Sequence, residues 1–148
     1  MSLSLFTMSC AKSVAAPDVI EGTVGLEELT STQLQSALQS IPPITDTTGV
    51  TFDFSQGYIS PSSGYYSFSV NSSGFANASQ ANILTELKRV LNEYQGDVTF
   101  TPSPSWDSDT TSSYNRTLTV QITSSAYNVP SNLKTVKIQL YLMGGTWQ

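Results

Sequence analysis

Residues 79–94, with the sequence SQANILTELKRVLNEY, carry the strongest secondary-structure signal of the chain. The apolar residues of this stretch recur at three- and four-residue spacing: Ile83, Leu84, Leu87, Val90, Leu91 and Tyr94. Such spacing gathers side chains on one side of an α-helix. Gly96 follows as a C-terminal stop. The sequence therefore predicts an amphipathic helix that begins near Asn77 or Ser79, ends near Tyr94 and packs one face on a core.

A shorter helix is predicted before it, over residues 31–41. Residues 30–33, TSTQ, have the form of a capping box, in which the threonine hydroxyl accepts a backbone N–H and the glutamine reaches back. The apolar residues that follow again share one side of a helix: Leu34, Ala37, Leu38 and Ile41. Pro42 and Pro43 end this helix because neither ring nitrogen can donate a hydrogen bond.

Alternation of apolar and polar residues predicts the strands. It is clearest at residues 50–54, 66–70, 117–123 and 135–143. Further strands are expected at 97–101 and, as a short segment, at 18–24. Residues 56–64 and 102–114 are rich in serine and contain proline, so we expect loops there. Residues 124–132 are too many for a two-residue hairpin turn.

Both predicted helices lead into the same tripeptide, Val-Thr-Phe, at residues 50–52 and 98–100, an offset of 48 residues. This repeat fits a duplicated αββ unit, and it also fits chance, because identity outside the tripeptide is poor. In either case the predicted order is β-α-β-β-α-β-β-β, an α+β fold with two helices packed on an antiparallel or mixed sheet. We expect a single domain at residues 18–143, a flexible N-terminal arm at 1–17 and a C-terminal tail at 144–148.

The composition argues against several classes of function. The 148 residues include 24 Ser and 18 Thr, no His and one Cys, the net charge is −5, and charged residues make up 11%. Without His, a Ser-His-Asp triad and a histidine zinc ligand are impossible. The negative charge argues against nucleic-acid binding, which needs clustered Lys and Arg. We expect no catalytic, metal or cofactor-binding residues, and hence no enzyme.

The first residues, MSLSLFTMSCAK, resemble the end of a bacterial lipoprotein signal, in which a small residue precedes a lipid-bearing cysteine, here Cys10. They depart from that pattern because no Lys or Arg precedes the apolar stretch, and Ser4 and Thr7 interrupt it. The alternative is an unprocessed arm in which Cys10 is a buried or free thiol. No other segment approaches the roughly 20 apolar residues of a membrane span.

Aromatic residues expected in loops are the candidate contact residues, such as Tyr58, Tyr65, Trp106 and Tyr114. Tyr and Trp at such positions anchor protein–protein contacts. They can also stack on sugar rings, with Asp107 and Asp109 accepting hydrogen bonds from the sugar hydroxyls. Trp147, in the tail, is expected to dock in a neighbouring subunit, so that removing the tail weakens assembly without unfolding the domain.

Few charges, many small hydroxyl residues and flexible arms are typical of building blocks that work by mutual contact. Low lysine content also suits interfaces, where lysine is depleted. We therefore predict a non-enzymatic structural protein of a repeating extracellular or virion assembly, of the phage head, neck or tail type. Its partners would be other copies of itself and neighbouring assembly proteins. The alternative is a secreted or lipid-anchored binding domain of the bacterial outer surface, with a glycan as its ligand.

Overall fold

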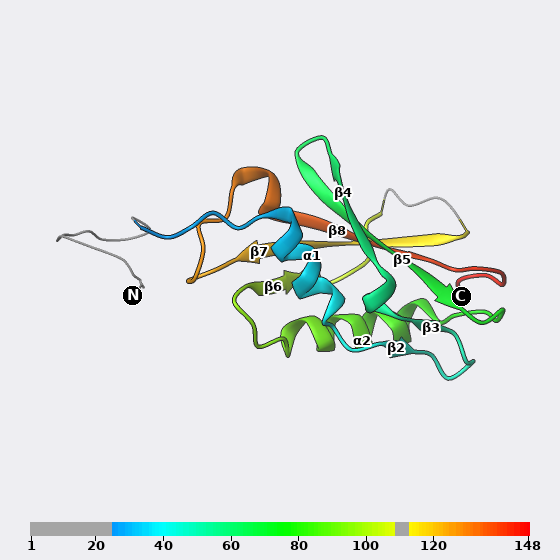
Figure 1. Ribbon diagram of the computed structural model, residues 1–148. Helices are drawn as coiled ribbons and strands as arrows, with labels where there is room; N and C mark the ends of the chain where they lie inside the picture. The colour runs from blue at the N-terminus through cyan, green and yellow to red at the C-terminus, as the bar shows by residue number, and fades with distance from the viewer. Residues whose placement is uncertain (1–24, 109–112) are drawn as a thin grey trace.

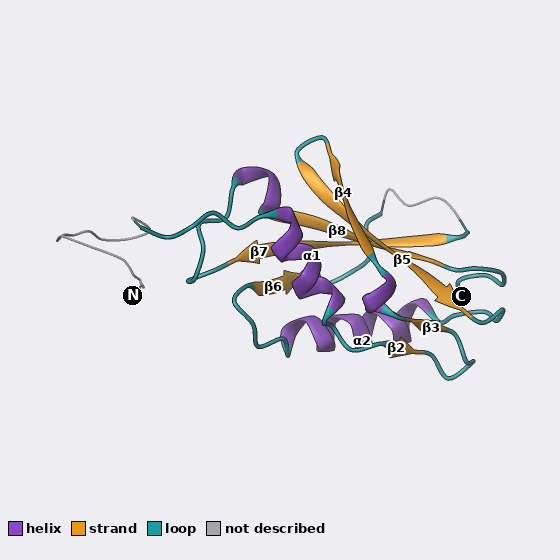
Figure 2. Cartoon of the chain, viewed as in Figure 1, coloured by secondary structure: helices purple, strands orange, loops and turns teal. Residues whose placement is uncertain are grey.

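The computed structural model describes residues 25–108 and 113–148, so the predicted arm at 1–17 and strand at 18–24 lie outside the described residues. The described part has an α+β fold with two helices and a mixed sheet of seven strands (Figures 1 and 2). The helices are α1 (Ser31–Gln39) and α2 (Gln80–Asn92). The strands are β2 (Ile44–Thr45), β3 (Thr51–Phe52), β4 (Tyr58–Ser62), β5 (Tyr65–Ser73), β6 (Thr99–Pro102), β7 (Asn115–Thr123) and β8 (Thr135–Tyr141). Two short 3-10 helices, η1 (Phe54–Gln56) and η2 (Ser131–Leu133), complete the order.

The sheet has the order β2-β3-β5-β8-β7-β6. One edge of β5 pairs with β4 over its first half and with β3 at its end, while the other edge pairs with β8. The β5–β8 pair is parallel and the remaining pairs are antiparallel. The hairpin of β4 and β5 projects beyond the other strands (Figure 1).

Both helices begin where the sequence places them. At α1 the Thr30 hydroxyl accepts the Gln33 backbone N–H at 3.1 Å, and the Gln33 side chain accepts the Thr30 N–H at 3.0 Å, which confirms the capping box. At α2 the Ser79 hydroxyl accepts the Asn82 backbone N–H at 3.2 Å. Each helix ends two residues earlier than predicted. After α2 the chain turns so that the Tyr94 ring packs on Phe100, 5.0 Å between centroids.

A single hydrophobic cluster fills the space between the helices and one face of the sheet. The inward residues of the three long strands alternate as predicted: Tyr66, Phe68 and Val70; Leu118, Val120 and Ile122; Val136, Ile138 and Leu140. Both helices contribute their buried stripes to this cluster, so they lie on the same face of the sheet. The alternate residues of these strands point outward and lie on the opposite face of the sheet.

The described order has two strands that the prediction lacks. Residues 56–64, expected to be a loop, contain β4, which forms a hairpin with β5 through a turn at Gly64, with φ of +82°. Pro61 is tolerated there because β4 is an outer strand, where a missing N–H breaks no ladder. β2 has two residues, too few to show any alternation.

The turn between β2 and β3 is tied to the start of α2 by the buried carboxylate of Asp46. Its Oδ2 accepts the backbone N–H of Ser79 at 2.9 Å, and its Oδ1 accepts that of Thr47 at 2.8 Å. Burial raises the pKa of Asp46, but hydrogen bonds from Ser79, Thr47 and two side chains outweigh it and hold the pKa below its ordinary value. The carboxylate also lies at the positive end of the helix dipole.

Candidate functional site

The face of the sheet opposite the core, called the open face below, carries mostly polar side chains. No helix of the described residues covers it, because both helices belong to the core side. Strand alternation and register place these residues on it: Tyr58, Ser60 and Ser62 of β4; Tyr65, Ser67, Ser69 and Asn71 of β5; Thr135, Lys137, Gln139 and Tyr141 of β8; Asn115, Thr117, Thr119 and Gln121 of β7. Lys137 is the one charged residue of this set.

The charge of Lys137 is compensated within the chain. Its Nζ lies 3.1 Å from Oδ2 of Asp107 and 5.2 Å from the centroid of the Tyr65 ring. Asp107 is held in turn by the Thr119 hydroxyl, 2.9 Å from Oδ1, and by its own N–H, which donates to the Thr117 carbonyl at 2.8 Å. The segment that follows β6 therefore folds back along β7 and neutralises the centre of the open face.

Two of the predicted contact residues lie on the open face. Tyr58 and Tyr65 both point to it from the β4–β5 hairpin, at opposite ends of the paired region. Tyr58 is 56% exposed and Tyr65 is half-buried. Tyr141 adds a third ring to this face, and its hydroxyl donates to the Gln139 side chain at 2.7 Å. The Ser67, Ser69 and Thr117 side chains are buried, so the face presents its tyrosines with the amides and the remaining hydroxyl groups.

The two tryptophans lie elsewhere, on the core side. Trp106 is half-buried, and its indole N–H donates to the carbonyl of Gln80 at 3.1 Å. Trp147 is 7% exposed and lies 5.9 Å from Trp106 between ring centroids. Its N–H donates to the Tyr114 carbonyl at 3.1 Å. Both indole N–H groups are therefore paired within the chain.

The predicted tail at residues 144–148 packs on its own chain. Ala78 donates its N–H to the Thr146 carbonyl at 3.1 Å, and Gln148 donates to the Ala78 carbonyl at 2.7 Å. The first residue of α2, Gln80, donates its otherwise unpaired N–H to the Gln148 carbonyl at 2.8 Å. Trp147 is therefore docked in its own core, which leaves little of it for a neighbouring subunit.

The remaining predicted contact residue, Tyr114, adjoins Trp147, whose indole N–H donates to its carbonyl. Tyr114 is 66% exposed but precedes β7, away from Tyr58 and Tyr65 on the β4–β5 hairpin. Cys10 and Asp109 lie outside the described residues. The structure therefore brings two of the five predicted contact residues, Tyr58 and Tyr65, onto one surface.

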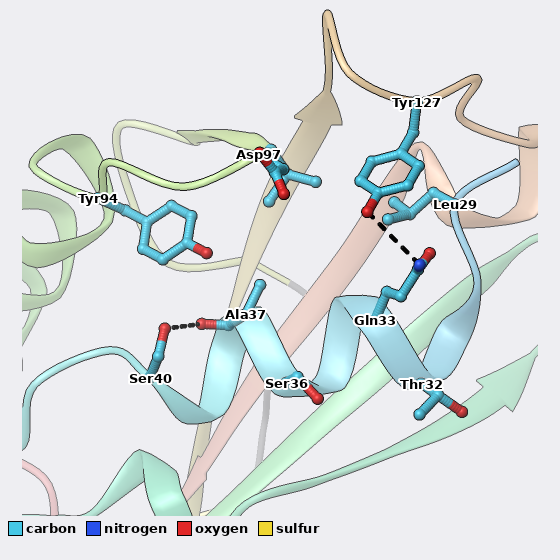
Figure 3. A pocket seen from close by; sticks show the side chains of 10 residues that line it. Leu29, Thr32, Gln33, Ser36, Ala37, Ser40, Tyr94, Asp97 and Tyr127 are labelled. Carbon is cyan, nitrogen blue, oxygen red and sulfur yellow. Dashed lines mark hydrogen bonds between the residues drawn. The ribbon is translucent and has the colours of Figure 1, made fainter. Parts of the chain in front are cut away.

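A groove of about 380 Å³ opens on the other side of the molecule, above α1 (Figure 3). Tyr94 and Tyr127 stand on opposite sides of it, and Leu29, Ala37 and Val98 contribute apolar surface. The Gln33 side chain donates to the Tyr127 hydroxyl at 3.5 Å. Among the described residues that line the groove none is cationic, and Asp97 carries the one carboxylate.

Comparison with family models, curated proteins and solved structures finds no match. Function must therefore be argued from the chain itself. Neither described helix combines the length and apolar character needed to cross a bilayer. Residues 25–108 and 113–148 also contain no group of three or more acidic or Cys side chains arranged to hold a metal ion.

Sequence reasoning missed most of the open face and the groove. The outward residues of the predicted strands at 117–123 and 135–143 were a usable signal, because alternation fixes Lys137, Gln139 and Tyr141 opposite the core. The groove had no such signal, since Gln33, Tyr94 and Tyr127 come from three distant segments.

Proposed function

We propose that this protein is a non-enzymatic structural subunit of a repeating extracellular or virion assembly, and that the open face is a contact surface between subunits. The observation that carries the proposal is a sheet face that no helix of the described residues covers, and whose side chains, apart from Lys137, are tyrosines, small hydroxyls and amides. Interfaces are enriched in tyrosine and depleted in Lys, Glu and Asp. Ser, Thr and Tyr also lose little rotamer freedom when a contact orders them.

The compensated ion pair supports the same proposal. Lys137 and Asp107 have 26% and 13% of their side-chain surface exposed, so much of their desolvation has already occurred within the chain. A partner that covers the open face would therefore bury no unpaired charge, which is the most costly event at an interface.

The sheet edges favour contact through faces rather than through added strands. The three outer strands are β2, β4 and β6: Pro43 directly precedes β2, Pro61 lies within β4 and Pro102 ends β6. The Gln35 side chain also accepts the Ile59 backbone N–H at 2.8 Å, which satisfies a donor of β4. Proline and capped backbone groups are the means by which proteins block edge-to-edge pairing.

The duplicated αββ unit stays a prediction. In its favour, each helix is followed by two strands that are antiparallel neighbours: β3 and β5 after α1, β6 and β7 after α2. Against it, β2 and β4 belong to the first half and have no counterpart in the second. The lipid-anchored alternative depends on Cys10, which lies outside the described residues, and no contact of the described residues favours it.

The proposal is tested by absolute mass from light scattering over a concentration series of the full chain. We expect growth from 16.0 kDa to larger species. The double variant Tyr58→Lys/Ser60→Lys places two charges on the open face, at an outer strand that tolerates lysine, and should reduce the mean mass. Thr85→Lys, an exposed position on α2, is the matched control and should leave it unchanged. A wild-type chain that stays monomeric throughout would overturn the proposal.

A further inference from the structure

The groove above α1 lies beside the start of the described chain. Leu29 contributes to its apolar surface and is 2% exposed. Asn128 holds this part of the chain in place: its N–H donates to the Glu27 carbonyl at 2.9 Å, and its side-chain amide donates to the Leu26 carbonyl at 3.0 Å. The Leu29 N–H donates to the Asn128 carbonyl at 2.8 Å. The residues that precede Leu26 are therefore tethered next to the groove.

The charge and the aromatic rings of the groove favour an occupant with one positive charge. The Asp97 side chain is exposed, and none of the ion pairs between described residues includes it. Tyr94 and Tyr127 stand on opposite sides of the groove (Figure 3), and the face of a tyrosine ring attracts a cation. The rest of the surface between the two rings is largely apolar. A suitable occupant therefore combines a single cation with apolar side chains.

The sequence that precedes the described part contains a segment with this composition. Lys12 is the one basic residue before Lys88, and no acidic residue occurs before Asp18. Residues 11–17, with the sequence AKSVAAP, therefore carry a single positive charge, and the others are apolar except for one serine. Segments with proline suit grooves that are lined by aromatic rings, because proline loses little conformational entropy when it binds.

Charge distinguishes residues 11–17 from the sequence on either side of them. Residues 18–28 contain four acidic residues and no basic one, so the Asp97 carboxylate would repel them. Residues 1–10 contain no charged side chain, so they would leave that carboxylate without a partner. Among the residues before the described part, Lys12 alone offers a side chain that can pair with Asp97.

The connection between this segment and the groove is long enough for the contact and short enough to favour it. Residues 18–24 link the segment to the described part, and a fully extended chain of that length spans about 25 Å. Gly25, with φ of +92°, lets the chain change direction there. A tethered segment has an effective concentration in about the millimolar range at a site that its linker can reach. An occupant from a separate molecule lacks this advantage.

We propose that residues 11–17 bind in the groove above α1 of their own chain, with the Lys12 ammonium beside the Asp97 carboxylate and the apolar side chains between Tyr94 and Tyr127. This inference does not rest on the proposed function, because the contact is made within one chain. The groove and the open face lie on opposite sides of the molecule. The bound segment therefore leaves the open face available to other subunits.

Cys10 makes a direct test possible, because it is the single cysteine of the chain and lies two residues before Lys12. A nitroxide attached to Cys10 broadens the NMR signals of backbone amides that lie near it. The labelled protein is the full chain with Tyr58→Lys/Ser60→Lys, which is designed to prevent contact through the open face.

The amide signals of Ala37 and Val98, which line the groove, should lose most of their intensity. The amide of Ala78 is the matched control and should keep its intensity. Ala78 precedes α2 and Tyr94 follows it, and the 13 residues of this helix span about 20 Å.

A charge exchange tests the assigned pair. Asp97→Lys and Lys12→Glu should each restore the signals of the groove, because two like charges then face one another. The double variant Lys12→Glu/Asp97→Lys should broaden them again. Asp97 is exposed, so its substitution is expected to leave the fold intact, and unchanged signals outside the groove check this.

A mixture distinguishes the chain's own segment from that of a second copy. An isotope-labelled chain with Cys10→Ser is mixed with an unlabelled chain that carries the nitroxide, and its groove signals should stay sharp. Broadening in the mixture assigns the groove to a second copy and overturns the inference. Sharp groove signals in the singly labelled chain, or broadening that Asp97→Lys leaves unchanged, also overturn it. The proposed function is decided separately, by the growth of the wild-type chain in light scattering.

Discussion

The indole of Trp147 stacks on the ring of Phe52, with centroids 5.7 Å apart and 10° between the planes. Phe52 is fully buried on β3. The guanidinium carbon of Arg116, a residue of β7, lies 5.7 Å from the centroid of the indole ring. Trp147 thus joins strands from both halves of the sheet. Trp147 therefore packs in the core in the same way as an inward side chain of the sheet.

We expect Trp147→Ala to lower the free energy of unfolding by about 3–5 kcal/mol, because it leaves a large cavity against Phe52. Urea unfolding followed by circular dichroism measures this loss. Trp147→Phe should recover part of it, since a ring still stacks. Phe75→Ala is the matched control at an exposed ring and should change stability little. A loss below about 1 kcal/mol for Trp147→Ala would contradict the assigned role.

We expect Asp46→Asn to destabilise the fold at pH 7 by about 1–3 kcal/mol, because an amide cannot accept all the hydrogen bonds that the carboxylate accepts. The pKa of Asp46 in the folded chain lies below its value of about 3.9 in the unfolded chain. Its charged form therefore stabilises the fold above about pH 4, and this contribution is lost as the pH falls through the folded pKa.

Urea unfolding of both proteins between pH 2.5 and pH 7, on the order of half-unit steps, checks this dependence. The difference between wild type and Asp46→Asn should shrink toward acid. Glu27→Gln, at an exposed carboxylate, is the control for a simple loss of charge. A difference that is constant with pH would show that Asp46 does not stabilise the fold through its charge.

The capping box of α1 gives a third prediction. Thr30→Ala removes the hydroxyl that accepts the Gln33 N–H and should cost about 1 kcal/mol. Thr30→Ser keeps that hydroxyl and should cost less. Thermal unfolding of the three proteins makes the comparison, and equal losses for both substitutions would mean that the hydroxyl is not what stabilises the helix start.

The ion pair between Lys137 and Asp107 gives a fourth prediction. In a double-mutant cycle with Lys137→Met and Asp107→Asn, we expect a coupling of about 1 kcal/mol that weakens with added salt. The pair is partly buried, which limits screening. A coupling of zero in low salt would show that the two side chains are held near each other without stabilising the fold.

The sequence was a good guide wherever the pattern is local. Three- and four-residue spacing located α2, and the capping box located the start of α1, because both depend on residues one turn apart. Alternation identified the inward side of β5, β7 and β8, since each has a long apolar row on the core. These elements establish the α+β class and the two-layer arrangement.

Features that depend on distant partners were missed. β4 is polar and contains Pro61, and it is a strand only because β5 pairs with it. Asp46 stands in the sequence Asp-Thr-Thr-Gly, which is typical of a turn, but nothing local connects it with Ser79. The sequence indicates that Trp147 docks in an apolar site. Its partner Phe52 lies far away along the chain, so the local pattern does not distinguish a neighbouring subunit from its own core.

The position of β8 has a consequence for how the chain acquires its fold. β8 lies between β5 and β7, yet the ribosome makes it after both of them. Until it emerges, β5 and β7 each have an unpaired inner edge, and neither β5 at residues 65–73 nor β7 at residues 115–123 contains a proline to block it. Sheet formation must wait for long-range pairing, which is slow. The nascent chain is therefore most prone to misassociate during synthesis, before β8 closes the gap.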